Sequence, residues 1–228
     1  ILQTLLWSPV IATPSKASPL SNPRGNMSAN QPTKYAWSYS SINLYKQCPH
    51  KYYRIRVKKD IVEPESEQMR YGTEVHSALE NYVKDGTPLL KNYERYQALL
   101  DPLRDMEGDK YPEHRMALGF DRKPSTWGKY WVRGIADLVV VNDDTAFVVD
   151  YKTGKSSKYA DTKQLELMSL AIFKHFPHIK KVRTGLLFVI AQDFVKADFH
   201  ARDEFVMWRP WFEDTSRLEK ALELDVWN

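Results

Sequence analysis

The chain has few of the features that mark secreted or membrane proteins. Cys48 is the single cysteine, so an internal disulfide is impossible and a reducing compartment is the simpler expectation. No apolar run approaches the roughly 18 residues of a membrane span. The first residues also lack the basic and long apolar regions of a signal peptide. We therefore expect a cytoplasmic protein with no membrane partner.

The chain also lacks a strong excess of either charge. Its formal net charge of +4 at pH 7 permits an anionic partner without requiring one. Hydrophobic residues make up 43% and charged residues 27% of the chain, which is ordinary for a globular protein. Composition alone therefore excludes a fibrous or membrane class and leaves the function open.

The chain has a proline-rich first part and a longer second part. Residues 1–34 contain five of the 13 prolines among serine, asparagine and threonine, without periodicity, so we predict that they are disordered. The chain does not begin with methionine, and Met27 is a candidate for the true start. Residues 35–228 are long enough for a full core and are predicted to form a single domain.

Hydrophobic periodicity predicts both helices and strands in the second part. We expect helices at about 40–48, 65–85, 91–106, 162–175 and 214–224. We expect strands at about 113–120, 131–141, 146–151, 184–191 and 195–200. Helices followed by a strand meander and a strand–helix–strand unit predict an α/β fold with a mixed central β-sheet flanked by helices.

The stretch 134–154 carries the most informative pattern. Two apolar β-type runs are joined by a polar turn, which predicts a hairpin. Asp137 lies in the first run and Asp150 ends the second, with Lys152 two residues later on the same face. Charges in such apolar surroundings must be paired or bind metal. Mg²⁺ prefers oxygen ligands of this kind, and the backbone carbonyl of Tyr151 is a further candidate.

Three other residues each have a structural alternative to a role in this site. His76 lies on the apolar stripe of the 65–85 helix, where it is either a core histidine or a metal ligand, and the two aspartates favour the ligand. Gln164 follows Asp161 at the spacing of a capping box, so a helix cap and a site role are both open. Glu113 is either a further metal-binding carboxylate or a surface residue.

A run of cations and tyrosines precedes the 65–85 helix. A solvated helix face is the default interpretation of such a run, and contact with DNA is the functional one. The residues that would contact DNA are Lys51, Tyr52, Tyr53, Arg54, Arg56 and Lys58. Most large aromatics pack in cores, but five more are further candidates for stacking on bases: Trp127, Tyr130, Trp131, Trp208 and Trp211.

Four elements in order along the chain resemble the PD-(D/E)XK nuclease superfamily. They are the helix segment Gly72–His76, the strand segment Gly134–Asp137, the segment Asp150–Lys152 and the later glutamine Gln164. The likeness is greatest to the RecB-like branch, which includes phage-type exonucleases and CRISPR adaptation nucleases, and it spans roughly residues 38–211. Met168 stands where that branch usually has a tyrosine.

The resemblance implies a restriction-endonuclease-like core and an Mg²⁺- or Mn²⁺-dependent DNA nuclease. It implies that Asp137, Asp150, Lys152 and Gln164 are catalytic and that His76 joins the aspartates as a metal ligand. The expected reaction is hydrolysis at DNA ends, leaving 5′-phosphates, in recombination, repair or phage DNA metabolism. The expected setting is the cytoplasm of a bacterium or of a phage-infected host, with recombination or annealing proteins as candidate partners.

The same resemblance raises the question of an iron–sulfur cluster. Cluster-bearing relatives place one cysteine at the position of Cys48 and three near the C-terminus, and this chain has no others. We therefore expect no cluster from this chain, either because this member lacks one or because the C-terminus is truncated. Two other function classes stay open, namely an inactive DNA-binding module on the same fold and an enzyme that uses Lys152 as a Schiff-base nucleophile.

Overall fold

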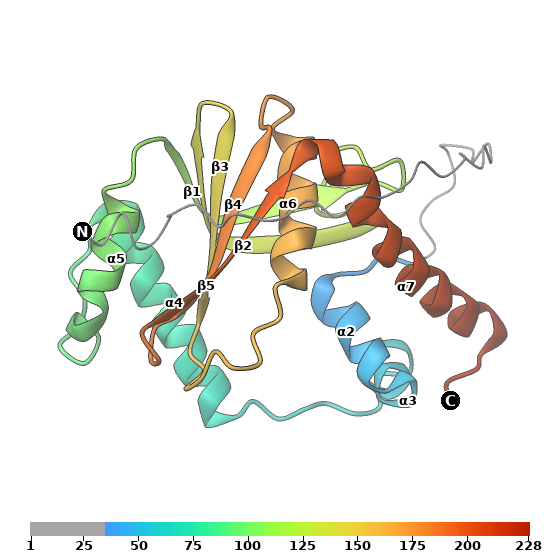
Figure 1. Cartoon of the computed structure of the whole chain (residues 1–228). Helices are drawn as coiled ribbons and strands as arrows, with labels where there is room; N and C mark the ends of the chain where they lie inside the picture. The colour runs from blue at the N-terminus through green and yellow to red at the C-terminus, as the bar shows by residue number, and fades with distance from the viewer. Residues whose placement is uncertain (1–34) are drawn as a thin grey trace.

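The computed structural model describes residues 35–228 (Figure 1), so the predicted disorder of residues 1–34 lies outside the described residues. The elements before the sheet are α2 (Tyr39–Gln47), α3 (Pro49–Tyr52), the π-helical turn η1 (Tyr53–Val57), α4 (Glu67–Asp85), the 3₁₀ turn η2 (Glu94–Tyr96) and α5 (Gln97–Arg104). They are followed by β1 (Asp109–Leu118), β2 (Val132–Asn142), β3 (Thr145–Lys152), α6 (Lys163–His175), β4 (Lys181–Phe188) and β5 (Asp193–His200). The 3₁₀ turn η3 (Ala201–Asp203) and α7 (Glu204–Leu224) come last.

The five strands form one mixed sheet in the order β1-β2-β3-β4-β5. All neighbouring pairs are antiparallel except β3 and β4, which are parallel and joined through α6, as a parallel pair requires a crossover. The predicted hairpin is present between β2 and β3. Asn142 pairs with Thr145, and Asp143 has φ 51° in the two-residue turn between them.

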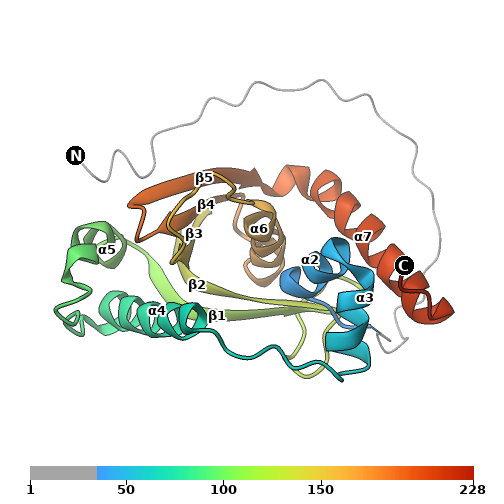
Figure 2. The same cartoon turned by 90° about the horizontal axis from the view of Figure 1, so that it is seen from below.

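Helices cover both faces of the sheet (Figure 2). On one face, Leu165 and Leu170 of α6 pack in a core that also contains Ala136 of β2 and Trp208 of α7. On the other face, α4 and α5 pack against a second core. The predicted α/β class, with a mixed central sheet flanked by helices, is confirmed.

Helix α4 brings the candidate histidine to the sheet. Its N-terminus is capped by Ser66, and it ends at the predicted glycine, Gly86, which has φ 75°. The buried residues of α4 are Val75, Leu79, Tyr82 and Val83. The sequence predicts an apolar stripe that starts at Met69, but Met69 is 59% exposed, so the buried face begins further along the helix.

Two of the predicted elements differ from those observed. The last helix begins at Glu204, ten residues before the predicted start, because Met207, Trp208 and Trp211 are buried along its first turns. The helix predicted at 91–106 is the turn η2 followed by the eight-residue α5. Within residues 35–228, none of the helices combines the length and apolar character needed to cross a bilayer.

Candidate active site

The two aspartates lie opposite each other where β2 and β3 begin to separate. The β2–β3 ladder ends at the pair Leu138 and Val149, which places Asp137 and Asp150 just beyond it. Asp137 Oδ2 accepts a hydrogen bond of 2.7 Å from the backbone N–H of Tyr151. The carboxylate of one strand therefore fills the place where the backbone ladder would have continued.

Asp150, Lys152 and Gln164 form one connected group. Lys152 Nζ lies 2.6 Å from Asp150 Oδ2 and donates a 3.0 Å hydrogen bond to Gln164 Oε1. Gln164 Nε2 in turn donates a 2.7 Å hydrogen bond to Asp150 Oδ1. Gln164 thus uses both ends of its amide on the site. It does not cap α6, whose N-cap is Thr162 without a side-chain bond, so the capping-box alternative is wrong.

Burial makes Asp150 an unusual carboxylate. Its side chain is 6% exposed, and burial raises its pKa to about 6, with Asp137 adding to the rise and Lys152 opposing it. Asp150 Oδ2 is buried, and the protein compensates its charge only through Lys152 Nζ at 2.6 Å. A buried oxygen in this state is suited to a cation, because a cation would stabilise its charge without a donor hydrogen.

His76 approaches the aspartates from α4. Its Nδ1 lies 3.4 Å from Asp137 Oδ2, and its ring meets that of Tyr151 edge-on at 5.9 Å between centroids. Burial alone would lower the pKa of His76, but Asp137 and Asp150 outweigh burial and raise it. The structure therefore places the histidine beside the carboxylates and on the open side, with its side chain 33% exposed.

Two glutamates lie near this group. Glu113 on β1 is exposed and has φ 47°, and the β1–β2 pairing is interrupted there, between the pairs Pro112–Leu138 and His114–Ala136. Glu80 is half-buried, and its pKa is raised by burial and then by Glu113, with Asp137 adding to the rise. From its place in the 65–85 helix, the sequence predicts that Glu80 lies on another face than His76 and is solvated. Its position four residues after His76, on the same helix face, was the signal that could have shown its place.

The donor set fits a hard divalent cation that keeps several waters. Asp137, Asp150 and His76 offer two carboxylates and one imidazole, and Mg²⁺ is typically bound by one or two carboxylates with water and substrate phosphate. In residues 35–228 no three His, Cys, Asp or Glu side chains are already gathered as a metal cage. Tyr151 pairs with Leu187 in the β3–β4 ladder, and its carbonyl stays a predicted ligand.

The basic run at residues 51–59 is largely neutralised within the chain. Arg54 and Lys58 both pair with Asp60, at 2.6 Å and 2.8 Å. Lys51 pairs with Glu63 at 2.7 Å. The tyrosines of the run pack instead on Trp227: the Tyr52 ring is 6.0 Å from it and the Tyr53 ring 5.1 Å, with Tyr52 buried. Of the predicted DNA-contacting cations, only Arg56 makes no ion pair with a carboxylate among the described residues.

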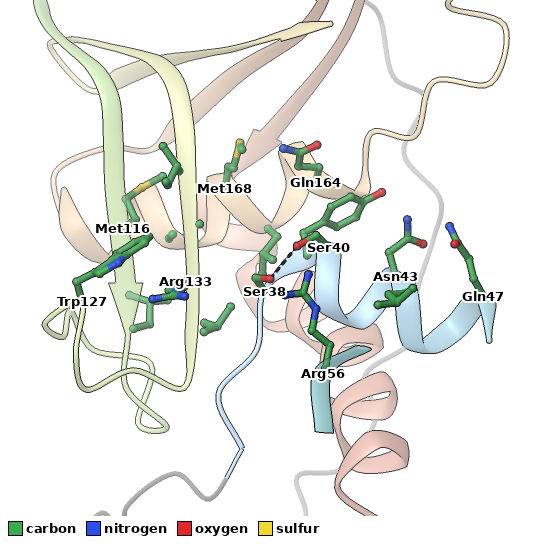
Figure 3. A pocket seen from close by; sticks show the side chains of 18 of the residues that line it. Ser38, Ser40, Asn43, Gln47, Arg56, Met116, Trp127, Arg133, Gln164 and Met168 are labelled. Atoms are coloured by element: carbon green, nitrogen blue, oxygen red, sulfur yellow. Dashed lines mark hydrogen bonds between the residues drawn. The ribbon is translucent and has the colours of Figure 1, made fainter. Parts of the chain in front are cut away.

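A cavity of about 700 Å³ lies beside the carboxylate site (Figure 3). It lies between α2, η1, the adjoining parts of β1 and β2, and α6. Gln164 lines it, so the residue that holds Asp150 and Lys152 also forms a wall of the cavity. Met168, at the position where the RecB-like branch usually has tyrosine, lines it as well.

Comparisons with known proteins give a family match and likenesses to solved structures. The family model of the PD-(D/E)XK nuclease superfamily matches residues 36–127, which include His76 and Glu113 and end before Asp137. A solved structure titled "Crystal structure of SSO0001" is 14% identical, with a TM-score of 0.46 over 84% of this chain and 79% of that one. No curated protein matches. The predicted superfamily is confirmed, and the RecB-like branch stays a prediction.

Proposed function

We propose that this chain, a member of the PD-(D/E)XK nuclease superfamily, is an Mg²⁺- or Mn²⁺-dependent deoxyribonuclease that degrades DNA from its ends. The observation that carries the proposal is the convergence of Asp137, Asp150, Lys152 and Gln164 from β2, β3 and α6, with His76 reaching them from α4. Charge is gathered here at the end of the β2–β3 ladder, where it is useful only if it meets a charged ligand.

Asp137, Asp150 and His76 would hold the metal. Bound there, the metal would acidify a water molecule and neutralise charge on the scissile phosphate. Gln164 fixes the orientation of Asp150 through Oδ1, which leaves the buried Oδ2 facing Lys152. Lys152, held by Gln164 and 34% exposed, can donate hydrogen bonds to the attacking water or to a phosphate oxygen.

Two other functions are less well supported. A Schiff-base enzyme needs an uncharged lysine, but Asp150 lies 2.6 Å from Lys152 Nζ and stabilises its charge. An inactive DNA-binding module would have no need for a buried carboxylate with a raised pKa, since such a group opposes folding at neutral pH.

One assay separates these functions. Linear and circular single-stranded forms of one DNA, both labelled within the strand, would be incubated with the protein in Mg²⁺, in Mn²⁺ and in EDTA. We expect loss of label from linear DNA in either metal, no reaction in EDTA, and an intact circle. Cleavage of the circle would replace end-directed action by internal cleavage, and equal reaction in EDTA would overturn the metal-dependent mechanism. Lys152→Ala should be inactive and folded.

A further inference from the structure

The 700 Å³ cavity beside Gln164 is far larger than a water or metal site requires. Ligand pockets for small organic molecules span about 300–1,000 Å³, so this cavity has room for bases and sugars. The proposed catalytic groups occupy its edge at Gln164, and the rest of its lining is assigned no role by the reaction. This space is therefore available to a part of the substrate that does not react.

The cavity carries positive charge that the chain itself does not neutralise. Arg56 on η1 and Arg133 on β2 lie on opposite sides of it (Figure 3), and neither pairs with a carboxylate in the described part of the chain. Glu63, which also lines the cavity, is neutralised by Lys51 at 2.7 Å. The two arginines are therefore available to an anion such as a phosphate.

Arg133 is held in a stack of flat groups. Its guanidinium carbon lies 4.6 Å from the ring centroid of Trp127 and 4.4 Å from that of Tyr130. Arg115 on β1 also contacts Trp127, which lies in the loop between β1 and β2: the guanidinium carbon of Arg115 is 5.5 Å from the ring centroid. Trp127 is half-exposed and lines the cavity, unlike the tryptophans at 37, 131, 208 and 211, which are buried. These contacts position Trp127 and Arg133 as a planar surface at the cavity wall.

Such a surface fits an unpaired strand. Bases stack on aromatic rings and guanidinium planes through their faces, and in a duplex the faces are covered by neighbouring bases while only the edges reach the grooves. Arg133 and Asp137 are four residues apart on β2, which is about 13 Å along the strand. A stacked strand advances about 3.4 Å per nucleotide, so this spacing corresponds to three or four nucleotides.

We propose that the cavity receives single-stranded DNA next to the cleavage site, with a base stacked on Trp127 and Arg133 and a backbone phosphate on Arg56. This inference rests on the proposed nuclease function. It adds that the substrate at the site is an unpaired strand, so that duplex ends must be opened or resected before they enter.

The test is binding without turnover. Fluorescence anisotropy in EDTA would compare a labelled 20-nucleotide single strand with a blunt duplex of the same sequence. Trp127→Ala should weaken single-strand binding by about 5- to 150-fold, the range for loss of one base stack, and leave duplex binding unchanged. Trp127→Phe, which keeps a ring, should restore most of the affinity. Phe205→Ala, which removes an aromatic side chain 75% exposed on α7, is the matched control and should change neither.

Arg133→Gln keeps the Trp127 ring and removes the cation beside it. This variant is the second test, for the case that Trp127→Ala does not fold. It should also weaken the single strand selectively. The proposal is overturned if folded Trp127 and Arg133 variants bind the single strand as the parent does, or lose single-strand and duplex affinity equally. The binding measurement in EDTA does not depend on cleavage. An inactive parent protein would therefore refute the proposed nuclease function, and the binding measurement would still decide whether the cavity holds an unpaired strand.

Discussion

Replacing Asp150 by asparagine should abolish hydrolysis and at the same time stabilise the metal-free protein. Burial raises the pKa of this carboxyl from 3.8 to about 6, so the folded state holds its proton more tightly than the unfolded state does. Ionised Asp150 therefore opposes folding, and stability falls as pH rises from about 4 to about 6, with the full effect present at pH 7. A shift of about 2 pKa units corresponds to about 3 kcal/mol.

Asparagine keeps the shape of the side chain without the charge. Its amide oxygen can still accept the hydrogen bond from Gln164, and Lys152, 34% exposed, remains solvated. We therefore expect Asp150→Asn to raise the free energy of unfolding at pH 7 by up to about 3 kcal/mol, or about 6–12 °C in Tm for a chain of this length. Asp144→Asn, at the exposed hairpin turn where Lys180 lowers the pKa of the aspartate, should give no gain.

Urea unfolding in EDTA at pH 4, 5, 6 and 7 measures this directly. The difference between variant and parent should be small at pH 4, grow to about pH 6 and then level off, since over that range the unfolded carboxyl is ionised while the folded one still holds its proton. A variant less stable than the parent, or a difference independent of pH, would refute the reasoning and make Asp150 a structural residue. Retained nuclease activity in the variant would refute its place in the mechanism.

Other substitutions test separate parts of the site. His76→Ala should raise the metal concentration for half-maximal activity roughly tenfold or more while the metal-free Tm changes little, whereas the reverse result would make it a core histidine. Gln164→Ala should lower kcat by about 10- to 100-fold with KM unchanged, and a change confined to KM would contradict its contacts to Asp150 and Lys152. Arg56→Gln should reduce the salt slope of single-strand binding by about 0.7, while Lys58→Gln, whose partner is Asp60, should not; equal slopes in both would show that DNA enters elsewhere. Gly185→Ala should destabilise the fold by about 1–3 kcal/mol in urea unfolding, because a Cβ there meets the Phe194 ring within 2.0–2.8 Å; unchanged stability would mean that the ring moves freely.

The sequence predicted the fold class because apolar periodicity and turn residues are local signals. The β2–β3 hairpin shows this, since its turn and both of its strands can be identified within about 20 residues. The sequence also placed Asp137 inside one strand and Asp150 at the end of the next. It could not decide the role of Gln164, because a helix cap and a contact across the site use the same residue at the same position. Only the distance to Asp150, 14 residues away in the chain, separates the two roles.

Rotation of helical segments was the other limit. The pattern of the basic run gave no means of telling Arg56, which lines the cavity, from Arg54 and Lys58, which pair with Asp60. Nor did it show that Tyr52 would pack on Trp227, a contact that spans most of the chain. Partners that lie far away in sequence fix these side chains, and periodicity within one element carries no information on them.

The pairing of β1 with β2 is interrupted at Glu113 and Asp137. Past this point the alternation of side chains between the two faces of the sheet is shifted by one residue. Before it, Ala136 belongs to the core under α6, and after it Val139 and Val141 join that core while Leu138 and Val140 turn to α4. One strand thus carries two alternating patterns that are out of step by a residue, with Asp137 at the junction. Substitutions that continue either alternation of apolar residues through residue 137 would favour a regular strand. In a regular strand Asp137 would point away from His76 and from the backbone N–H of Tyr151.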